Sequence, residues 1–147
     1  MASYETTAET ALGIDEVFAY LSDFANTADW DPGVVEAEHL DDADTELGLG
    51  SRFRVVTSTA GSRQSLEYEI TEWDPPHRMV LVGTTPRLRS IDTLTFAATE
   101  GGGTRVTYHA DLALLGPSRV ADPVLHVAFQ VIGRRAAQGL REVLADG

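Results

Sequence analysis

The chain contains no cysteine among its 147 residues, and all 11 of its basic residues are arginine, so lysine is also absent. Without cysteine there are no disulfides, no thiolate zinc sites and no cysteine nucleophile. Without lysine there is neither Schiff-base catalysis nor the lysine of a P-loop. Stability must therefore come from packing, and several classes of catalysis are excluded.

Positive charge is also scarce, since 23 acidic residues give a formal net charge of −12. Nucleic acids and anionic membrane surfaces are bound through basic patches, so we expect no nucleic-acid partner. No apolar run approaches the ~18 residues of a membrane span, which predicts no integral membrane association. The segment Met1 to Glu5 lacks the basic region and apolar core of a signal peptide, and a cytoplasmic location is expected.

Length and composition predict one folded domain spanning residues 1–147. Hydrophobic residues make up 43% of the chain. A domain of this size buries roughly two thirds of its unfolded surface, which is enough for a substantial core. No repeat, low-complexity segment or linker suggests a boundary, and no pattern indicates an oligomeric state.

Alternation of apolar and polar residues is the clearest local signal. In one segment Tyr68, Ile70 and Glu72 share a side, and a Pro-Pro pair breaks the chain before the next strand because proline cannot donate to a ladder. Such patterns predict seven strands, at Ala2 to Thr10, Val34 to Leu40, Ser51 to Thr59, Arg63 to Trp73, Arg78 to Gly83, Leu88 to Ala98 and Thr104 to Leu114. Their short connections make neighbours antiparallel, because a parallel crossover needs a dozen or more residues.

Helical spacing of apolar residues predicts the remaining elements. A short helix begins near Ile14, with acidic residues in its first turn, and a second helical turn spans 23–28. Over residues 119–146 an apolar stripe predicts a long amphipathic helix. The predicted fold is α+β: a curved seven-stranded antiparallel sheet wrapped around a long C-terminal helix, with two short helices after the first strand.

This order of elements is that of the helix-grip fold, and short segments add a family likeness. They are Ile14 to Asp23, Ala28 to Val34, Gly50 to Phe53, the corner Glu72 to Arg78, Asp92 with Leu94 and Phe96, and Gly102 to Thr107. In this order, over nearly the whole chain, they resemble the START-like (SRPBCC) superfamily, in particular its bacterial polyketide cyclase/dehydrase-like branch. The resemblance implies a deep, largely apolar cavity between sheet and long helix, used for lipids, sterols, polyketides and other hydrophobic small molecules. It implies no single reaction, since one fold hosts many functions.

The concave face of the sheet and the last helix supply the candidate ligand-binding residues. By alternation and helical position we predict ligand contacts from Trp30, Phe53, Val55, Tyr68, Leu81, Leu94, Phe96, Tyr108, Leu125, Phe129 and Ile132. The competing interpretation is that most of the aliphatic members simply pack in the core, as apolar residues usually do. For Trp30, anchoring of its loop competes with a place at the edge of the cavity mouth.

Four polar side chains are candidate acid–base groups, although no catalytic set is legible. Because a buried phenol needs a hydrogen-bond partner, we expect Tyr68 and Tyr108 to bond either within the core or to a ligand oxygen. His126 falls at the edge of the apolar stripe, and Asp92 shares a strand face with apolar residues. Two placements are open for Asp92, namely the exposed end of its strand, or the cavity beside one of Arg52, Arg54, Arg87 and Arg89.

No motif for a metal or cofactor is present. The serine-nucleophile motif G-x-S-x-G is absent, and the glycines at 101–103 separate two strands, which predicts a hairpin turn and no phosphate loop. His109 and Asp111 lie two apart on one strand face with no second histidine near them in sequence, so an iron facial triad is not predicted. We therefore expect neither a metal nor a cofactor.

Three functions fit these features. The favoured hypothesis is binding or carriage of a hydrophobic small molecule, lipid or polyketide-like, because the apolar wall is long and no acid/base pair is legible. The alternatives are a cofactor-independent polyketide cyclase, aromatase or dehydratase, and a protein-interaction module. Two or more titratable groups with perturbed pKa inside the cavity would favour the enzyme, and a uniformly apolar cavity would favour carriage.

Overall fold

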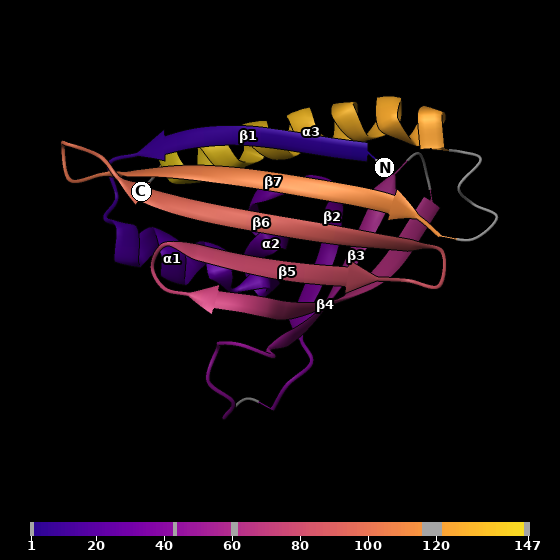
Figure 1. Ribbon diagram of the computed structural model, residues 1–147, viewed down its shortest axis with the longest axis horizontal. Coiled ribbons are helices and arrows are strands. Elements are labelled where there is room, and N and C mark those ends of the chain that lie inside the picture. The colour runs from indigo at the N-terminus through magenta and orange to yellow at the C-terminus, as the bar shows by residue number, and fades with distance from the viewer. Residues whose placement is uncertain (1, 43, 60–61, 116–121, 146–147) are drawn as a thin grey trace.

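A curved antiparallel sheet with helices on its concave side accounts for the described chain (Figure 1). The computed structural model describes residues 2–42, 44–59, 62–115 and 122–145. Its strands are β1 (Ala2–Thr10), β2 (Val34–His39), β3 (Arg52–Thr59), β4 (Ser62–Asp74), β5 (Arg78–Thr84), β6 (Leu88–Ala98) and β7 (Thr104–Leu114). The seven strands lie in the order β1-β7-β6-β5-β4-β3-β2, with antiparallel neighbours throughout. The predicted sheet is confirmed.

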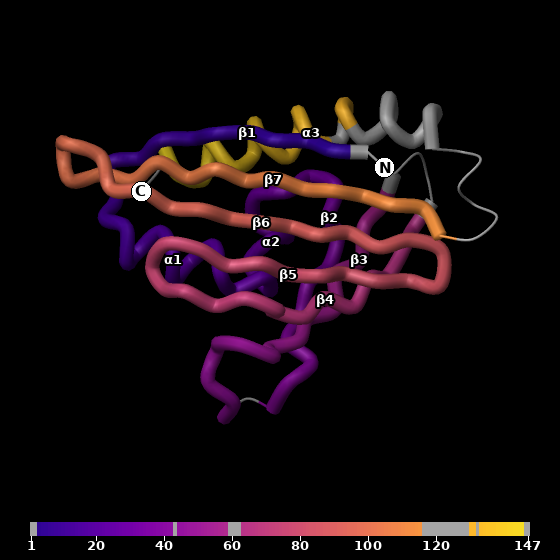
Figure 2. The backbone as a smooth tube through the Cα atoms, viewed as in Figure 1, coloured from indigo at the N-terminus to yellow at the C-terminus, as the bar shows by residue number. Residues whose placement is uncertain are grey.

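The helices follow the predicted order as well. They are α1 (Ile14–Ser22), the 3₁₀ turn η1 (Phe24–Asn26), α2 (Thr27–Trp30) and α3 (Asp122–Ala145). The backbone trace shows α3 running alongside β1 at the edge of the sheet (Figure 2). The last helix was expected over 119–146, and the residues of that range beyond α3 lie outside the described part of the chain. None of the described helices is long and apolar enough to cross a membrane.

The register of β4 departs from strict alternation at one point. Tyr68 opposes Gly83 on β5, but the pairing shifts between Ile70 and Glu72. Because an extra residue in one strand turns the following side chains to the other face, Glu72 is exposed and forms an ion pair with Arg78 at 3.2 Å. The expectation that Glu72 shares a side with Tyr68 and Ile70 is therefore wrong.

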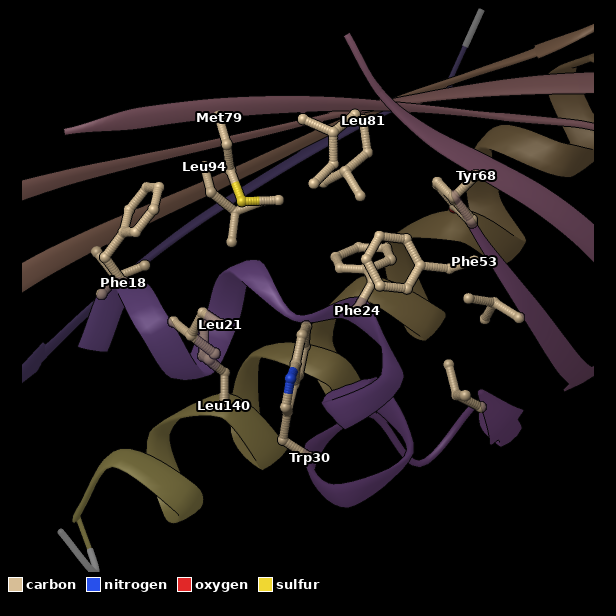
Figure 3. Packing of buried hydrophobic residues seen from close by; sticks show 14 of the residues in the cluster. Phe18, Leu21, Phe24, Trp30, Phe53, Tyr68, Met79, Leu81, Leu94 and Leu140 are labelled. Atoms are coloured by element: carbon tan, nitrogen blue, oxygen red, sulfur yellow. The ribbon is translucent and has the colours of Figure 1, made fainter. Parts of the chain in front are cut away.

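The hydrophobic core fills one half of the concave face. Phe18 of α1 packs edge-on against both Trp73 and Phe96, with ring centroids 5.1 Å apart in each pair. Phe24 of η1 packs against Phe53 at 6.3 Å. Figure 3 shows these helical side chains facing those of the sheet. The short helices thus occupy the space over this half of the sheet and leave the other half to α3.

The segment after α1 is also held against α3. Trp30 is 5% exposed, and a Cβ placed on Gly139 of α3 would collide with the Trp30 carbonyl oxygen. Glycine therefore permits a close approach of the α3 backbone to the end of α2 that alanine would prevent. This contact sets the position of Trp30 beside the space between α3 and the sheet.

Candidate functional site

A cavity of about 350 Å³ lies between α3 and the half of the sheet that the short helices leave uncovered. Its lining residues are Tyr4, Thr6, Trp30, Asp31, Gly33, Thr57, Gln64, Leu66, Tyr68, Leu88, Ser90, Asp92, Tyr108, Ala110, Leu112, Gly133, Ala136, Ala137 and Leu140. The volume is at the lower end of the range for small-molecule sites, and the mixture of many apolar and few polar groups is typical of such sites.

Asp92 is the polar centre of this cavity. It points inward from β6 and is only 3% exposed. The Ser90 hydroxyl donates to its Oδ1 at 2.7 Å, and the Tyr108 hydroxyl donates to its Oδ2. Residues i and i+2 of a strand share a face, which is why Ser90 and Asp92 meet. Both carboxylate oxygens therefore have a hydroxyl donor.

Burial shifts the protonation of this cluster. Loss of hydration raises the pKa of Asp92 to about 6, although the hydrogen bonds from Tyr108 and Ser90 oppose the rise. Burial, reinforced by the nearby Asp92 charge, also raises the pKa of Tyr108 and of Tyr68 well above the ordinary phenol value. The cavity thus holds an acid poised near neutrality beside two phenols that stay protonated.

Tyr68 reaches the cavity because the opposite strand leaves room for its ring. A Cβ on Gly83 would lie 2.6 Å from ring atoms of Tyr68, closer than side chains approach one another. The ring also packs against Phe24, with centroids 5.1 Å apart. Tyr68 is therefore fixed between the core and the cavity, and its phenol is close enough to Asp92 for the carboxylate charge to raise its pKa.

A second carboxyl group, Asp31, lies on the cavity wall after α2. Its Oδ1 accepts a hydrogen bond from the Gly33 backbone N–H at 2.9 Å, and burial raises its pKa despite that bond. Next to it, the Trp30 ring meets the Tyr108 ring edge-on with centroids 5.9 Å apart. The last residue of α2 therefore supplies an aromatic face to the wall, and the residue that follows it supplies an acid.

The predicted ligand-contacting residues separate into two groups. Trp30, Tyr68 and Tyr108 line the cavity, and Trp30 is buried at the end of α2. The sheet residues Phe53, Val55, Leu81, Leu94 and Phe96 are buried in the core and are not on the cavity wall. The reason is that α1 and η1 cover their half of the concave face, as the contacts of Phe18 and Phe24 show.

The remaining predicted residues are on α3. Leu125, His126, Phe129 and Ile132 lie outside the residues whose side chains the structure describes. Their roles stay predictions. The described residues of α3 on the wall are small or aliphatic, namely Gly133, Ala136, Ala137 and Leu140.

Asp92 lies in the cavity, as one of its two predicted placements had it, but without the arginine partner of that prediction. Asp92 is not at an exposed strand end, and its neighbours in the cavity are hydroxyls. Arg52 contacts Glu67, and Arg54 pairs with Glu38 at 2.7 Å on the outer face. The predicted pairing of Asp92 with Arg52 or Arg54 is therefore wrong. Arg89 is exposed, on the face opposite to Ser90, and Arg87 is not on the cavity wall either.

Sequence reasoning missed several polar members of the wall, among them Thr6, Asp31, Gln64 and Ser90. Ser90 carried a readable signal, since it precedes Asp92 by two residues on one strand and so shares its face. Asp31 carried none, because the direction of a loop side chain is not set by any periodicity. Asp92, Tyr68 and Tyr108 were predicted as polar candidates, whereas Asp31 was identified only in the structure.

Comparison with known proteins agrees with this architecture. The family described as polyketide cyclase/dehydrase and lipid transport matches residues 1–145, and the chain belongs to that family. An uncharacterised protein of Mycobacterium tuberculosis is 27% identical over 103 residues, which cover 69% of this chain and 71% of that protein.

Solved structures show the same fold. A START superfamily protein from Mycobacterium smegmatis superposes with a TM-score of 0.78 at 13% identity, covering 98% of this chain and 97% of that one. The Zhui aromatase/cyclase from a Streptomyces species superposes with a TM-score of 0.74 at 15% identity, covering 97% of this chain and 90% of that one. The predicted START-like, helix-grip fold is confirmed. At family level, the description covers polyketide cyclisation or dehydration and lipid transport.

Proposed function

We propose that this protein binds a hydrophobic small molecule, lipid or polyketide-like, in the cavity between α3 and the sheet. The observation that supports the proposal most directly is the cavity itself, a space of about 350 Å³. Its aliphatic wall, with Leu66, Leu88, Leu112 and Leu140, supplies apolar area for burial. The polar groups are concentrated around Asp92 and would fix the orientation of a bound molecule.

Filling the cavity tests this proposal. Ala110 of β7 faces the cavity and is 6% exposed, so Ala110→Phe should occupy the ligand space. Ala97 of β6 lies on the exposed outer face, which makes Ala97→Phe a matched control. An environment-sensitive apolar dye should bind the wild type and the control equally, and Ala110→Phe should weaken binding at least tenfold. Equal dye affinity in all three folded proteins would refute the cavity as the binding site.

A second function, cofactor-independent cyclisation or dehydration, is supported by a separate observation. Asp92, Tyr68 and Tyr108 converge on one cavity, and burial raises the pKa of each. Groups shifted in this way cluster at catalytic sites, because an acid or base works best when its pKa lies near the working pH. In this proposal Asp92 takes up a substrate proton and a phenol donates a hydrogen bond to the developing oxyanion.

The two functions predict different effects of substituting the polar groups, on ligand affinity in a carrier and on turnover in an enzyme. If the protein only carries its ligand, Asp92→Asn and Tyr108→Phe should alter affinity modestly, since a net hydrogen bond contributes about 0.5–1.5 kcal/mol. If it is an enzyme, wild type should turn over a polyketide-like substrate, and one of these variants should lower turnover by about 10²-fold or more with little change in affinity. Absence of turnover over a panel of poly-β-ketone substrates would favour carriage.

A further inference from the structure

The charged side chains on the described cavity wall are all acidic. Among the lining residues that the structure describes, Asp31 and Asp92 carry acidic side chains, and none is arginine or histidine. The neighbouring charges that act on Asp92 are Asp31 and Asp111, which are both acidic. A buried carboxylate is unfavourable unless a positive partner or several hydrogen bonds compensate it. No described residue of the wall supplies that positive charge.

The contacts of Asp92 do not neutralise it. Ser90 and Tyr108 donate hydrogen bonds to its two oxygens, but both are uncharged hydroxyls. The one arginine that the described contacts bring to the wall is Arg141, whose Nη2 donates to Thr6 Oγ1 at 3.2 Å from a solvent-exposed position. With a pKa of about 6, Asp92 is mostly ionised at pH 7.5. Its charge therefore has no buried counterion among these groups.

Aromatic rings adjoin the same carboxylates. Trp30, Tyr68 and Tyr108 all line the cavity, and the first and last of these pack edge to face. The faces of such rings attract cations, most strongly where water is excluded. Carboxylates beside aromatic faces form the chemical environment that receives an ammonium group, whereas a carboxylate ligand would meet like charge.

We propose that the cavity selects a hydrophobic ligand carrying a protonated amine, with the ammonium beside Asp92 and the Trp30 and Tyr108 rings and the apolar body along the aliphatic wall. This inference rests on the proposed function, namely that the cavity binds a hydrophobic molecule. It adds the sign of the ligand charge. An ammonium would provide the counterion that the described wall lacks. An anionic amphiphile such as a fatty acid would instead be repelled by the two wall carboxylates.

Three probes of equal chain length separate charge from hydrophobicity. Decylamine, decanol and decanoate should be titrated into the full chain at pH 7.5, below their aggregation concentrations, with affinity measured by calorimetry. Decylamine should bind about tenfold or more tighter than decanol, since bonds to charged groups are the stronger kind, and decanoate should bind most weakly. Asp92→Asn should reduce the amine preference to about twofold or less.

The matched control removes an equal charge from the outside of the sheet. Glu69 of β4 is exposed and is not on the cavity wall, so Glu69→Gln should keep the full amine preference. Decanol binding as tightly as decylamine, or decanoate binding more tightly than either, would overturn the inference and leave the cavity proposal standing. Failure of all three probes to bind would overturn both. The ranking on wild type decides the question even if Asp92→Asn does not fold.

Discussion

The hydroxyl of Tyr108 on β7 donates to the carboxylate of Asp92 on β6 across a diagonal of the sheet. Asp92 itself opposes Ala110, and Tyr108 opposes Leu94. Diagonal neighbours on one face of an antiparallel pair lie within reach of long aromatic side chains. Because the residue opposite Asp92 is only an alanine, the carboxyl group faces open cavity and is available to a ligand as well as to Tyr108.

The raised pKa of Asp92 predicts a characteristic dependence of stability on pH. In the folded protein the pKa is about 6, against 3.8 for the free side chain. Between these values the unfolded chain has lost the proton that the folded chain keeps, so the free energy of unfolding falls as pH rises. Relative to Asp92→Asn, wild type should lose about 2 kcal/mol of stability between pH 4 and pH 6.5.

Chemical denaturation at several pH values measures this difference. Glu69→Gln serves as the control, because it removes one acid from an exposed position and should keep the wild-type pH profile. If wild type and Asp92→Asn show parallel profiles from pH 4 to pH 6.5, the carboxyl group is not desolvated as the structure indicates.

Removal of the Tyr108 hydroxyl should raise the pKa of Asp92 further. The Tyr108 bond favours the ionised carboxylate and is the larger of the two hydrogen-bonding effects that oppose burial. In Tyr108→Phe we expect the carboxyl carbon of Asp92 to titrate about one pH unit higher by NMR. Tyr20→Phe, which removes a hydroxyl beside exposed Asp29, is the control and should leave that titration unchanged. A lower or unchanged value in Tyr108→Phe would contradict the assigned bond.

The space at Gly83 should be specific to the Tyr68 ring. Gly83→Ala places a methyl group against that ring, and overpacking of this kind costs about 1–3 kcal/mol of stability. In a Tyr68→Leu background the same substitution should be nearly neutral, because the smaller side chain leaves room. A double-mutant cycle in urea measures the coupling between the two sites. Additive effects would show that the ring does not occupy the space beside Gly83.

The contact between Gly139 and Trp30 predicts an effect opposite to helix propensity. Glycine to alanine within a helix ordinarily stabilises by up to about 1 kcal/mol. Here the added Cβ would collide with the Trp30 carbonyl oxygen, so Gly139→Ala should lower the midpoint of thermal unfolding. Gly101→Ala, in a turn where the added Cβ meets nothing within 4 Å, should leave the midpoint close to wild type. Stabilisation by Gly139→Ala would mean that α3 and the end of α2 are further apart.

The order and type of the elements were predictable because alternation and helical spacing are local properties of the sequence. The strand β6 was predicted from Leu88 to Ala98, and the structure gives the same bounds. The bulge near Glu72 was not predictable, since nothing in the local pattern distinguishes an extra residue from regular alternation. An error of that kind changes which face a side chain occupies without changing the fold.

The candidate site was predictable only in part, and for a different reason. Alternation correctly put Phe53, Leu94 and Tyr108 on the concave face. It contains no information about which part of that face the short helices cover, because this depends on contacts such as Phe24 against Phe53. Asp92 was a predicted candidate, but the second acid of the wall, Asp31, was missed because a loop sets the direction of its side chain. Site prediction therefore failed where it required tertiary packing.

Methyl NMR of a leucine-labelled sample can show whether a ligand occupies the cavity between α3 and the sheet. On addition of decanol, we expect shift changes at the wall residues Leu66, Leu88, Leu112 and Leu140, and little change at Leu21, Leu81 and Leu94, which are buried in the core away from the wall. Exposed Leu49 reports on nonspecific surface binding and should also stay unchanged. Shifts confined to Leu49, or larger in the core set than in the wall set, would contradict a ligand site in the cavity between α3 and the sheet.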